Sequence, residues 1–248
     1  MLYLDLRHPD EFDYSRLQAG DVIVVLAAIS SPDACAEDPA GTRELNVEGT
    51  TRFMKRATER GARVIFFSSD TVYGERESDA DENEPANPLG EYATMKRAVE
   101  VRFAAHPQVR SLRLSYVFSS EDRFTQYLLE CAEREEKAEI FHPFYRAVVH
   151  REDVVAGVIA LARRWDEFPE AVINFGGPEL IARTAFAEAL KDTVVPALQV
   201  RIVEPAADFF SRRPRVIRMI SPQLAPLLGR PARTLREAIG LEFNSGRK

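Results

Sequence analysis

The sequence predicts an α/β protein with a parallel, doubly wound sheet and a smaller α+β lobe. Residues 21–28 and 62–67 are short apolar runs, typical of strands that are buried on both faces of a parallel sheet. Helical periodicity alternates with such runs up to about residue 118, which implies right-handed crossovers between parallel strands. From residue 146 the order of elements changes, so we expect the later pieces to close over the carboxyl edge of the sheet.

Each element of the first half follows from its local pattern. Residues 41–60 place Leu45 and Phe53 on one stripe of a helix, and Gly61 follows as a stop signal. Residues 75–88 are acidic and contain two prolines, so we expect a surface loop there. The expected strands are residues 2–6, 21–28, 62–67 and 109–114, and the expected helices are residues 41–60 and 88–105.

The second half predicts a lobe, part of which returns to the core. We expect the core to cover residues 1–145 and the lobe to cover mainly residues 146–248. No Pro-, Gly- or Ser-rich linker divides the chain. The expected helices are residues 124–135, 153–164, 182–191, 221–228 and 234–239, and the expected extended pieces are residues 138–141, 146–150, 171–175 and 199–203.

The composition disfavours several classes of protein. The net charge of −6 over 248 residues argues against a nucleic-acid or membrane-surface protein, because both of these partners are anionic. The longest apolar run, residues 22–29, is shorter than the ~20 residues that a membrane helix needs. Residues 1–10 are too polar for a signal peptide. Cys35 and Cys131 lie far apart, so we expect reduced thiols in a cytoplasmic protein and no metal site.

Four side chains are the candidate catalytic groups. Ser69 and Asp70 follow the second apolar strand at its carboxyl end, where open α/β sheets bind ligands. Tyr92 and Lys96 are four residues apart in an expected helix and therefore share a face. Because a nearby ammonium favours the phenolate, Tyr92 is expected to lose its proton more easily. Ser69 would hold a substrate oxygen while Tyr92 moves a proton.

The set Ser69, Tyr92 and Lys96 resembles the short-chain dehydrogenase/reductase superfamily. Residues 68–74, Ser-Ser-Asp-Thr-Val-Tyr-Gly, look like the extended, nucleotide-sugar branch of that superfamily. The other segments that are similar to this branch are residues 21–28, 45–50, 113–118, 149–154 and 174–178. Their order along the chain matches the order in the family, so the resemblance implies a Rossmann-like core followed by a substrate-binding lobe.

The resemblance also implies a reaction, namely NAD- or NADP-dependent reduction or epimerisation at C4 of a nucleotide-linked sugar. The Thr-Asp-Glu of 4,6-dehydratases is replaced here by Ser69, Asp70 and Thr71, which is closer to the dTDP-4-dehydrorhamnose reductase group. We therefore rank a 4-ketoreductase first, an epimerase second and a dehydratase third. The catalytic residues implied are Ser69, Asp70, Tyr92 and Lys96.

Further positions are assigned by the same resemblance. The expected cofactor contacts are Ala27, Ala28, Tyr92, Lys96 and Tyr116, and the expected substrate contacts are Thr71, Tyr73 and Arg213. Arg213 would clamp a diphosphate, because guanidinium groups suit phosphate bidentately. Each position has a plainer interpretation: small residues also pack under helices, Tyr73 also packs in a core, and a basic cluster is commonly a solvated edge.

One family feature has no counterpart in the sequence. The family begins with a strand and a Gly-x-x-Gly-x-x-Gly turn that holds the dinucleotide pyrophosphate, and no such turn precedes Asp21. Residues 2–6 resemble the family's third strand, so the first βαβ unit is expected to be truncated. The strand at residues 21–28 would then have an open flank. Three explanations remain: a fragment or late start, pairing by residues 2–6, or a homodimer or partner chain that covers the edge.

The missing turn also opens a second functional interpretation. A chain that keeps the fold and lacks the cofactor loop would suit a non-catalytic binding or regulatory protein, and one relative of the family is the regulatory subunit of methionine adenosyltransferase. The presence of Ser69, Tyr92 and Lys96 favours the enzyme. The sequence leaves open which sugar and nucleotide bind and whether NAD or NADP is used.

Overall fold

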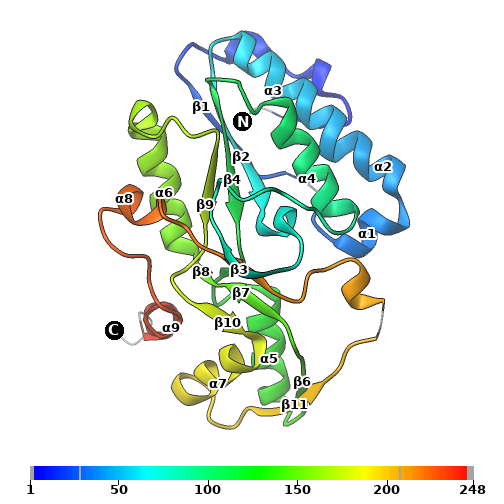
Figure 1. Ribbon diagram of the computed structural model, residues 1–248, viewed down its shortest axis with the longest axis vertical. Coiled ribbons are helices and arrows are strands. Elements are labelled where there is room, and N and C mark those ends of the chain that lie inside the picture. The colour runs from blue at the N-terminus through cyan, green and yellow to red at the C-terminus, as the bar shows by residue number, and fades with distance from the viewer. Residues whose placement is uncertain (1–2, 28, 207, 245–248) are drawn as a thin grey trace.

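A four-stranded parallel sheet lies at the centre of the computed structural model, which describes residues 3–27, 29–206 and 208–244 (Figure 1). The strand order is β1 (Val22–Val25), β2 (Arg63–Ser69), β4 (Val109–Leu114) and β9 (Val172–Phe175). Each neighbouring pair is parallel. The predicted α/β fold with a parallel sheet is therefore confirmed, although β1 is shorter than the run at residues 21–28.

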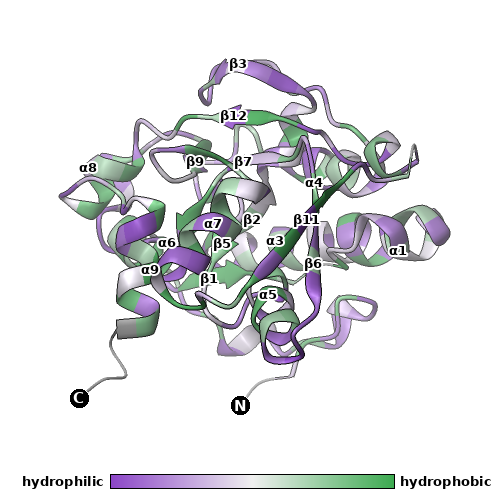
Figure 2. Cartoon of the chain, turned by 90° about the horizontal axis from the view of Figure 1, so that it is seen from below, coloured by the Kyte–Doolittle hydropathy of each residue, from purple (hydrophilic) through white to green (hydrophobic). Residues whose placement is uncertain are grey.

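Helices cover both faces of the sheet. One face carries α1 (Pro32–Glu37), α2 (Pro39–Arg43), α3 (Thr50–Glu59) and α4 (Glu91–Arg102), and the other carries α6 (Arg151–Arg163) and α8 (Leu224–Leu228), as Figure 1 shows. Buried side chains such as Phe53, Met54 and Val99 form the core under α3 and α4. Leu161 and Phe175 belong to the core under α6. Figure 2 shows the hydrophilic β3 on the outside of the molecule.

The expected helix at residues 41–60 is three segments rather than one. α2 is followed by a π-helical turn, Glu44–Gly49, and then by α3. Within the π-helical turn, the Asn46 side chain accepts a hydrogen bond from the Ile29 N–H (2.8 Å) and donates one to the Ile29 carbonyl (3.0 Å). The wide turn thus places an amide against the loop that follows β1, as π-bulges commonly do at functional sites.

The N-terminal segment does not add a strand to the sheet. Residues 3–6 lie outside any strand, and among the described residues β1 pairs only with β2. Leu6 and Tyr14 are buried against α3, and the Phe12 ring contacts the Phe53 ring edge-on at 5.5 Å. The prediction of a strand at residues 2–6 is wrong for the described part, because its apolar side chains pack on a helix. Pairing by this segment therefore does not close the flank of β1.

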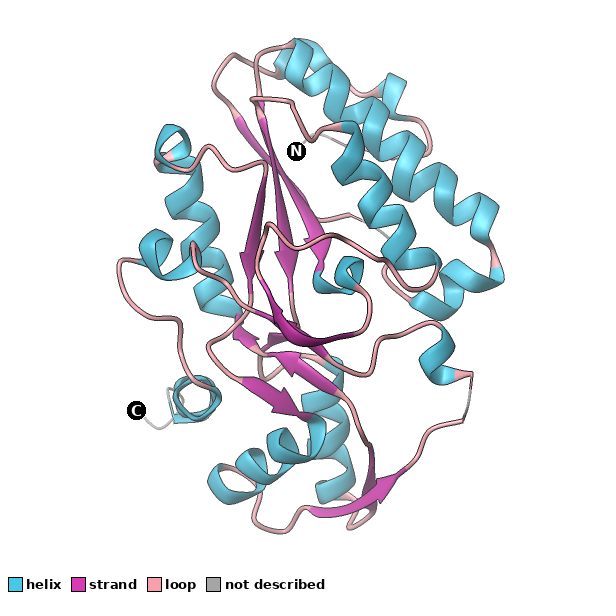
Figure 3. Cartoon of the chain, viewed as in Figure 1, coloured by secondary structure: helices cyan, strands magenta, loops and turns pink. Residues whose placement is uncertain are grey.

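In the described part of the chain, the lobe contains short strand pairs and helices, and some of its elements come from residues 123–147, within the range expected for the core. Its elements are α5 (Arg123–Glu133), β6 (Lys137–Phe141), β7 (Tyr145–Ala147), β10 (Leu180–Ala182), α7 (Arg183–Thr193), β11 (Gln199–Val203) and α9 (Leu235–Asn244). β6 pairs with β11 in parallel, and β7 pairs with β10 in antiparallel fashion (Figure 3). A further parallel pair, β5 (Val117–Phe118) with β8 (Val149–His150), lies between sheet and lobe.

The acidic segment at residues 75–88 contains a strand that the sequence analysis missed. β3 (Arg76–Ala80) pairs in parallel with β12 (Ile217–Met219). Its partner lies about 140 residues further along the chain, so no local pattern announces the pairing. The pair ties the late part of the chain to the core, close to the end of β2.

A buried charge network braces the helix that carries Tyr92 and Lys96. Glu100 of α4 accepts hydrogen bonds from Arg113 of β4 at 2.8 and 3.0 Å and from the Ser68 hydroxyl at 2.6 Å. The Glu100 and Arg113 side chains are 1% and 3% exposed. Burial alone would raise the pKa of Glu100, but these hydrogen bonds and the Arg113 charge hold it below its usual range.

None of the helices in the described ranges combines the length and apolar character that a membrane crossing requires. In the same ranges, His, Cys, Asp and Glu side chains do not gather into a group that could hold a metal ion.

Candidate active site

The candidate catalytic residues lie at the carboxyl end of β2. Ser69 is the last residue of that strand, and a 3-10 turn, Asp70–Tyr73, follows it. The turn ends at Gly74, whose φ is +69° and where a Cβ would lie 2.1 Å from the Asn87 carbonyl oxygen. Only glycine fits this position, since a side chain would clash with the backbone in a left-handed conformation. The turn aims Asp70 into the interior, where it is 4% exposed.

Tyr92 is a largely buried phenol whose pKa lies above its ordinary value. Burial, followed by the negative charges of Asp70 and Cys35, raises its pKa to about 12, against a smaller lowering by a hydrogen bond with Ser69. The groups that shift this pKa, Asp70 and Ser69, place Tyr92 near the carboxyl end of β2. The expectation that the Lys96 ammonium eases deprotonation of the phenol stays a prediction, because burial and nearby negative charges dominate the pKa of Tyr92.

Lys96 lies on the same side of α4 as Tyr92. Its Nζ is 5.8 Å from the Tyr92 ring centroid and donates a 2.6 Å hydrogen bond to the Phe67 carbonyl. Burial lowers the pKa of Lys96 to about 8, although the charges of Glu100 and Cys35 act in the opposite direction. The amine is therefore a buried group whose charge changes slightly above neutral pH.

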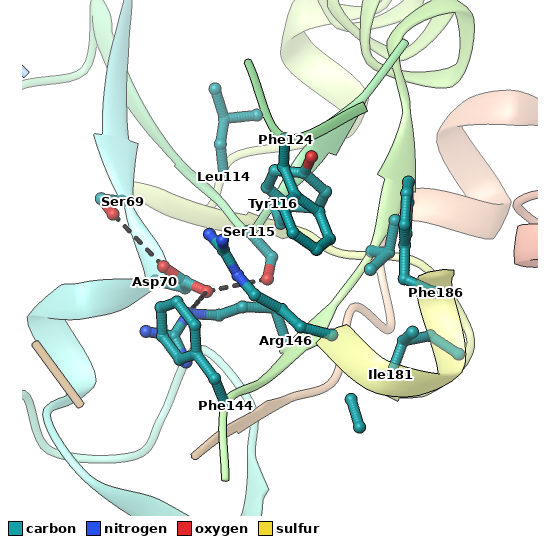
Figure 4. A pocket seen from close by; sticks show the side chains of 13 residues that line it. Ser69, Asp70, Leu114, Ser115, Tyr116, Phe124, Phe144, Arg146, Ile181 and Phe186 are labelled. Atoms are coloured by element: carbon teal, nitrogen blue, oxygen red, sulfur yellow. Dashed lines mark hydrogen bonds and ion pairs between the residues drawn. The ribbon is translucent and has the colours of Figure 1, made fainter. Parts of the chain in front are cut away.

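Asp70 joins the strand end to the lobe. One carboxylate oxygen accepts a 2.7 Å hydrogen bond from the Ser115 hydroxyl and lies 3.6 Å from Nε of Arg146, and the other accepts a 3.3 Å hydrogen bond from Ser69 (Figure 4). Burial raises the pKa of Asp70 in spite of the Arg146 charge and these hydrogen bonds. Asp70 therefore holds Ser69 and Arg146 in one network beside Tyr92.

A pocket of about 150 Å³ opens beside this network, between the sheet and the lobe. It is smaller than the ~300–1,000 Å³ that drug-sized ligands occupy, so it suits one end of a ligand. Its lining residues include Ser69, Asp70, Ser115, Tyr116, Phe124, Phe144, Arg146, Ile181, Arg183 and Phe186. Figure 4 shows Asp70 on the sheet side and Phe124 and Phe186 on the lobe side.

Sequence reasoning missed most of this wall. Arg146, Phe144 and Arg183 belong to β7, the segment before it and the start of α7, and only tertiary packing brings them to the strand end. The one available signal was positional: Arg146 opens the extended piece at residues 146–150. No spacing along the chain connects these residues with Ser69.

Three expected substrate contacts have other partners in the structure. The Tyr73 ring is fully buried, and its single hydroxyl proton is shared between two acceptors, the Asp81 carbonyl oxygen (2.7 Å) and the Asn174 side-chain oxygen (2.9 Å). Arg213 forms hydrogen bonds of 3.0 and 2.5 Å with the Asp33 carboxylate. Tyr73 therefore packs the core, which corrects its expected substrate contact. Arg213 ties the lobe to α1, and its expected diphosphate contact stays a prediction. The Thr71 hydroxyl donates to Ser69 (2.9 Å) and thus positions that side chain.

The expected cofactor contacts divide into three cases. Ala27 is exposed just after β1, in the loop that Asn46 holds, whereas Ala28 lies outside the described residues. The hydroxyl of Tyr116 donates to Asp122, and its ring packs on Phe186 in the lobe. Tyr116 thus forms part of the pocket wall instead of facing the end of β1.

The fold and the site define the class of protein. A parallel sheet with a serine at one strand end, and a tyrosine and a lysine on the following helix, is the arrangement of the extended short-chain dehydrogenases/reductases. Residues 4–245 match the family described as the RmlD substrate binding domain, and the chain belongs to this family.

Curated relatives are distant and longer. UDP-glucuronic acid decarboxylase 3 from Arabidopsis thaliana is 27% identical over 206 residues, which cover 76% of this chain and 59% of that protein. dTDP-4-dehydrorhamnose reductase from Sinorhizobium fredii is 27% identical over 149 residues, covering 59% and 50%. Methionine adenosyltransferase 2 subunit beta from Bos taurus is 25% identical over 203 residues, covering 78% and 61%. The chain thus spans between half and three fifths of these proteins.

Solved structures support the fold. A tyrosine-to-phenylalanine mutant of UDP-glucuronic acid 4-epimerase from Bacillus cereus superposes with a TM-score of 0.80 at 20% identity, covering 95% of this chain and 78% of that one. A hypothetical dTDP-4-dehydrorhamnose reductase from Sulfolobus tokodaii gives a TM-score of 0.79 at 20% identity, covering 94% and 84%. At such identities the likeness concerns the fold alone.

Proposed function

We propose that the chain reduces or epimerises a nucleotide-linked sugar at C4, with NAD or NADP as the hydride carrier. One observation carries the proposal: the buried carboxylate of Asp70, hydrogen-bonded to Ser69 and Ser115, lines the pocket together with Ser69, and Tyr92 is close enough for the Asp70 charge to raise its pKa. The relatives named as dTDP-4-dehydrorhamnose reductase and UDP-glucuronic acid decarboxylase support the substrate class. We further propose a cytoplasmic location and, over the open flank of β1, a second copy or a partner chain.

The residues have separate roles in this reaction. Ser69 donates a hydrogen bond to the C4 carbonyl oxygen, and Tyr92 gives its proton to that oxygen as C4 becomes tetrahedral. Asp70 holds Ser69 and positions Arg146 through their shared network. Lys96 stabilises the phenolate that Tyr92 leaves behind, because a positive charge within a few ångströms favours the anion. When bound, NADH or NADPH would supply the hydride that reaches C4.

The described residues fit one end of such a cofactor. Ala27 offers a small exposed surface after β1, and Lys96 has N–H groups beyond the one that it gives to Phe67. These suit a nicotinamide ring and its ribose. The sequence contains no Gly-x-x-Gly-x-x-Gly turn that would cradle a pyrophosphate.

We therefore expect the 248-residue chain to bind NADH and reduced nicotinamide mononucleotide with affinities within about tenfold of each other, or ~1.4 kcal/mol. The reason is that Ala27 and Lys96 contact only the nicotinamide and its ribose, which NADH and reduced nicotinamide mononucleotide have in common. Isothermal titration of both compounds measures the ratio. NADH bound several hundredfold more tightly would place an adenosine-diphosphate site in this chain and would contradict the assignment.

The pH dependence of the reaction should report Lys96. With a pKa of about 8, Lys96 is charged below that pH and loses its proton above it, while Tyr92 stays protonated. We expect kcat/KM to be level below about pH 8 and to fall above it. Lys96→Met should remove this descending limb and lower the plateau, whereas Lys55→Met, on the exposed side of α3, should leave the profile unchanged. An unaltered descending limb in Lys96→Met assigns the titration to another group.

A second candidate is a non-catalytic regulatory protein, and the match to methionine adenosyltransferase 2 subunit beta supports it. The open flank of β1 also favours a protein that works within a complex. The two candidates are separated by turnover. If the chain binds a nucleotide sugar but does not reduce a 4-keto nucleotide sugar at saturating reduced cofactor, the regulatory protein is favoured.

A further inference from the structure

Backbone carbonyls hold Arg146 so that its Nε faces Asp70. The Arg146 Nη2 donates a hydrogen bond to the Pro214 carbonyl (2.8 Å), and its Nη1 donates to the carbonyls of Tyr145 (2.6 Å) and Arg215 (3.3 Å). With these nitrogens occupied, Nε lies 3.6 Å from the Asp70 carboxylate, as Figure 4 shows. The carbonyls of Pro214 and Arg215 therefore help to set where a mostly buried positive charge meets Asp70.

Glu75 holds the same backbone segment from its N–H side. One oxygen of its carboxylate accepts the Arg215 N–H at 2.6 Å, and the other accepts the Val216 N–H at 2.9 Å. The Val216 carbonyl in turn accepts the Arg76 N–H at 2.8 Å. Hydrogen bonds to an ionised acceptor are roughly twice as strong as those between neutral groups. The Glu75 carboxylate is therefore a strong anchor for residues 214–216.

Glu75 and Asp70 stand at the two ends of one turn. Asp70 begins the 3-10 turn that follows β2, and Glu75 comes directly after the glycine that ends this turn. The turn thus holds residues 214–216 twice, directly through Glu75 and indirectly through Asp70 and Arg146. Because Asp70 also accepts a hydrogen bond from Ser69, this closed ring of contacts includes the candidate catalytic serine.

We propose that Glu75 is a positioning residue for the catalytic turn that begins at Asp70. Its carboxylate fixes the backbone at residues 214–216, and this backbone keeps Arg146 beside Asp70. The inference rests on the proposed function and adds to it a residue outside the pocket. Glu75 is exposed and does not line the pocket beside Ser69, so it acts through Arg146 and not on a ligand.

The charges around Asp70 allow the position of Arg146 to be followed in the protein alone. Arg146 of β7 and Tyr92 of α4 face Asp70, and Arg183 of α7 and Glu75 face Arg146. Moving Arg146 away raises the pKa of Asp70, because a nearby positive charge favours the carboxylate. Removing the negative charge of Glu75 would by itself lower the pKa of Asp70. The two effects therefore differ in sign.

The test measures the pKa of Asp70 by ¹³C NMR of protein labelled at the aspartate side-chain carboxyls, with Asp70→Asn to assign the signal. The wild type, Glu75→Ala, Arg146→Met and the double variant are titrated without substrate or cofactor. We expect Glu75→Ala and Arg146→Met each to raise the pKa of Asp70, by about 1 pH unit. The double variant should not exceed Arg146→Met, because Glu75 acts through Arg146.

Two further variants control the experiment. Glu75→Gln keeps one acceptor oxygen and should give a smaller rise, and it also serves if Glu75→Ala does not fold. Glu237→Ala removes another exposed carboxylate, which accepts the N–H and the hydroxyl of Thr234 at 2.8 Å each and does not line the pocket beside Ser69. It should leave the pKa of Asp70 unchanged. Thermal unfolding of each variant shows whether the fold is retained.

Turnover is the second readout. In the reduction of a 4-keto nucleotide sugar, Glu75→Ala should lower kcat by about 10- to 100-fold in the wild-type background and should have no effect in the Arg146→Met background. An unchanged or lowered pKa of Asp70 in folded Glu75→Ala would overturn the inference and leave the proposed function standing. A raised pKa in a protein without any turnover would support the placement of Arg146 by Glu75 and overturn the proposed function alone.

Discussion

Replacing Tyr92 by phenylalanine should lower kcat by about 10²- to 10⁴-fold, the usual contribution of a positioned general acid. The substitution removes only a hydroxyl, so the folded state should lose about 1 kcal/mol at most. Steady-state reduction of a 4-keto nucleotide sugar, with reduced nicotinamide cofactor at the highest attainable concentration, measures the change in kcat.

Tyr73→Phe is the matched control for this experiment. It also removes one phenolic hydroxyl, but from a ring that is fully buried and bonded to Asp81 and Asn174. We expect a loss of about 0.5–1.5 kcal/mol in the free energy of unfolding and an unchanged kcat. If Tyr92→Phe retains near-normal kcat, or Tyr73→Phe loses as much activity, the general acid has been wrongly assigned.

Glu100→Gln should have the largest effect on stability, with about 3–5 kcal/mol lost from the free energy of unfolding. The substituted glutamine would keep the shape of the side chain, but Arg113 would remain buried without a counter-charge. Urea-induced unfolding at neutral pH measures the loss. The same network positions α4, so a lower kcat from a disturbed Tyr92 and Lys96 is expected as well.

Glu48→Gln is the control, because Glu48 also receives two arginine hydrogen bonds of 2.8 Å, from Arg102, but at the surface. Both of these side chains are 35% exposed, so the expected loss is about 0–1 kcal/mol. If Glu100→Gln lowers the free energy of unfolding by about 1 kcal/mol or less, the buried pair contributes no more to stability than the surface pair, which contradicts the prediction.

The network also has a pH signature. The folded-state pKa of Glu100 is below its unfolded value, so its contribution to stability is complete above the unfolded pKa of about 4.3 and is lost as the pH falls through the lower folded value. Acid should therefore destabilise the wild type more steeply than Glu100→Gln below that pH.

The sequence was sufficient for features that depend on a local pattern. The bounds of β4 in the structure match the strand expected at residues 109–114. Ser69 ends a parallel strand and Tyr92 lies at the start of α4, which packs beside that strand. Strand polarity and helical spacing fix such an arrangement without knowledge of the rest of the fold.

The features that the sequence did not predict depend on tertiary contacts. The stripe of apolar residues at 41–60 predicted one continuous helix. The structure has a π-helical turn there, in which Asn46 is hydrogen-bonded to Ile29, and this contact cannot be read from the helical pattern. Phe144 and Arg183 reach the pocket only because β7 and β10 pair in the lobe. The raised pKa of Tyr92 likewise reflects burial and neighbouring charges that spacing along a helix does not reveal.

The most direct test of the proton-transfer site follows deuterium from the reduced cofactor to the sugar. A 4-keto nucleotide sugar is incubated with nicotinamide nucleotide deuterated at its hydride position, and the product is examined by NMR. We predict deuterium on C4 with the wild type and a product yield lower by at least about 10²-fold with Tyr92→Phe. No deuterium on C4 with the wild type, or equal yields from the two proteins, would contradict the account.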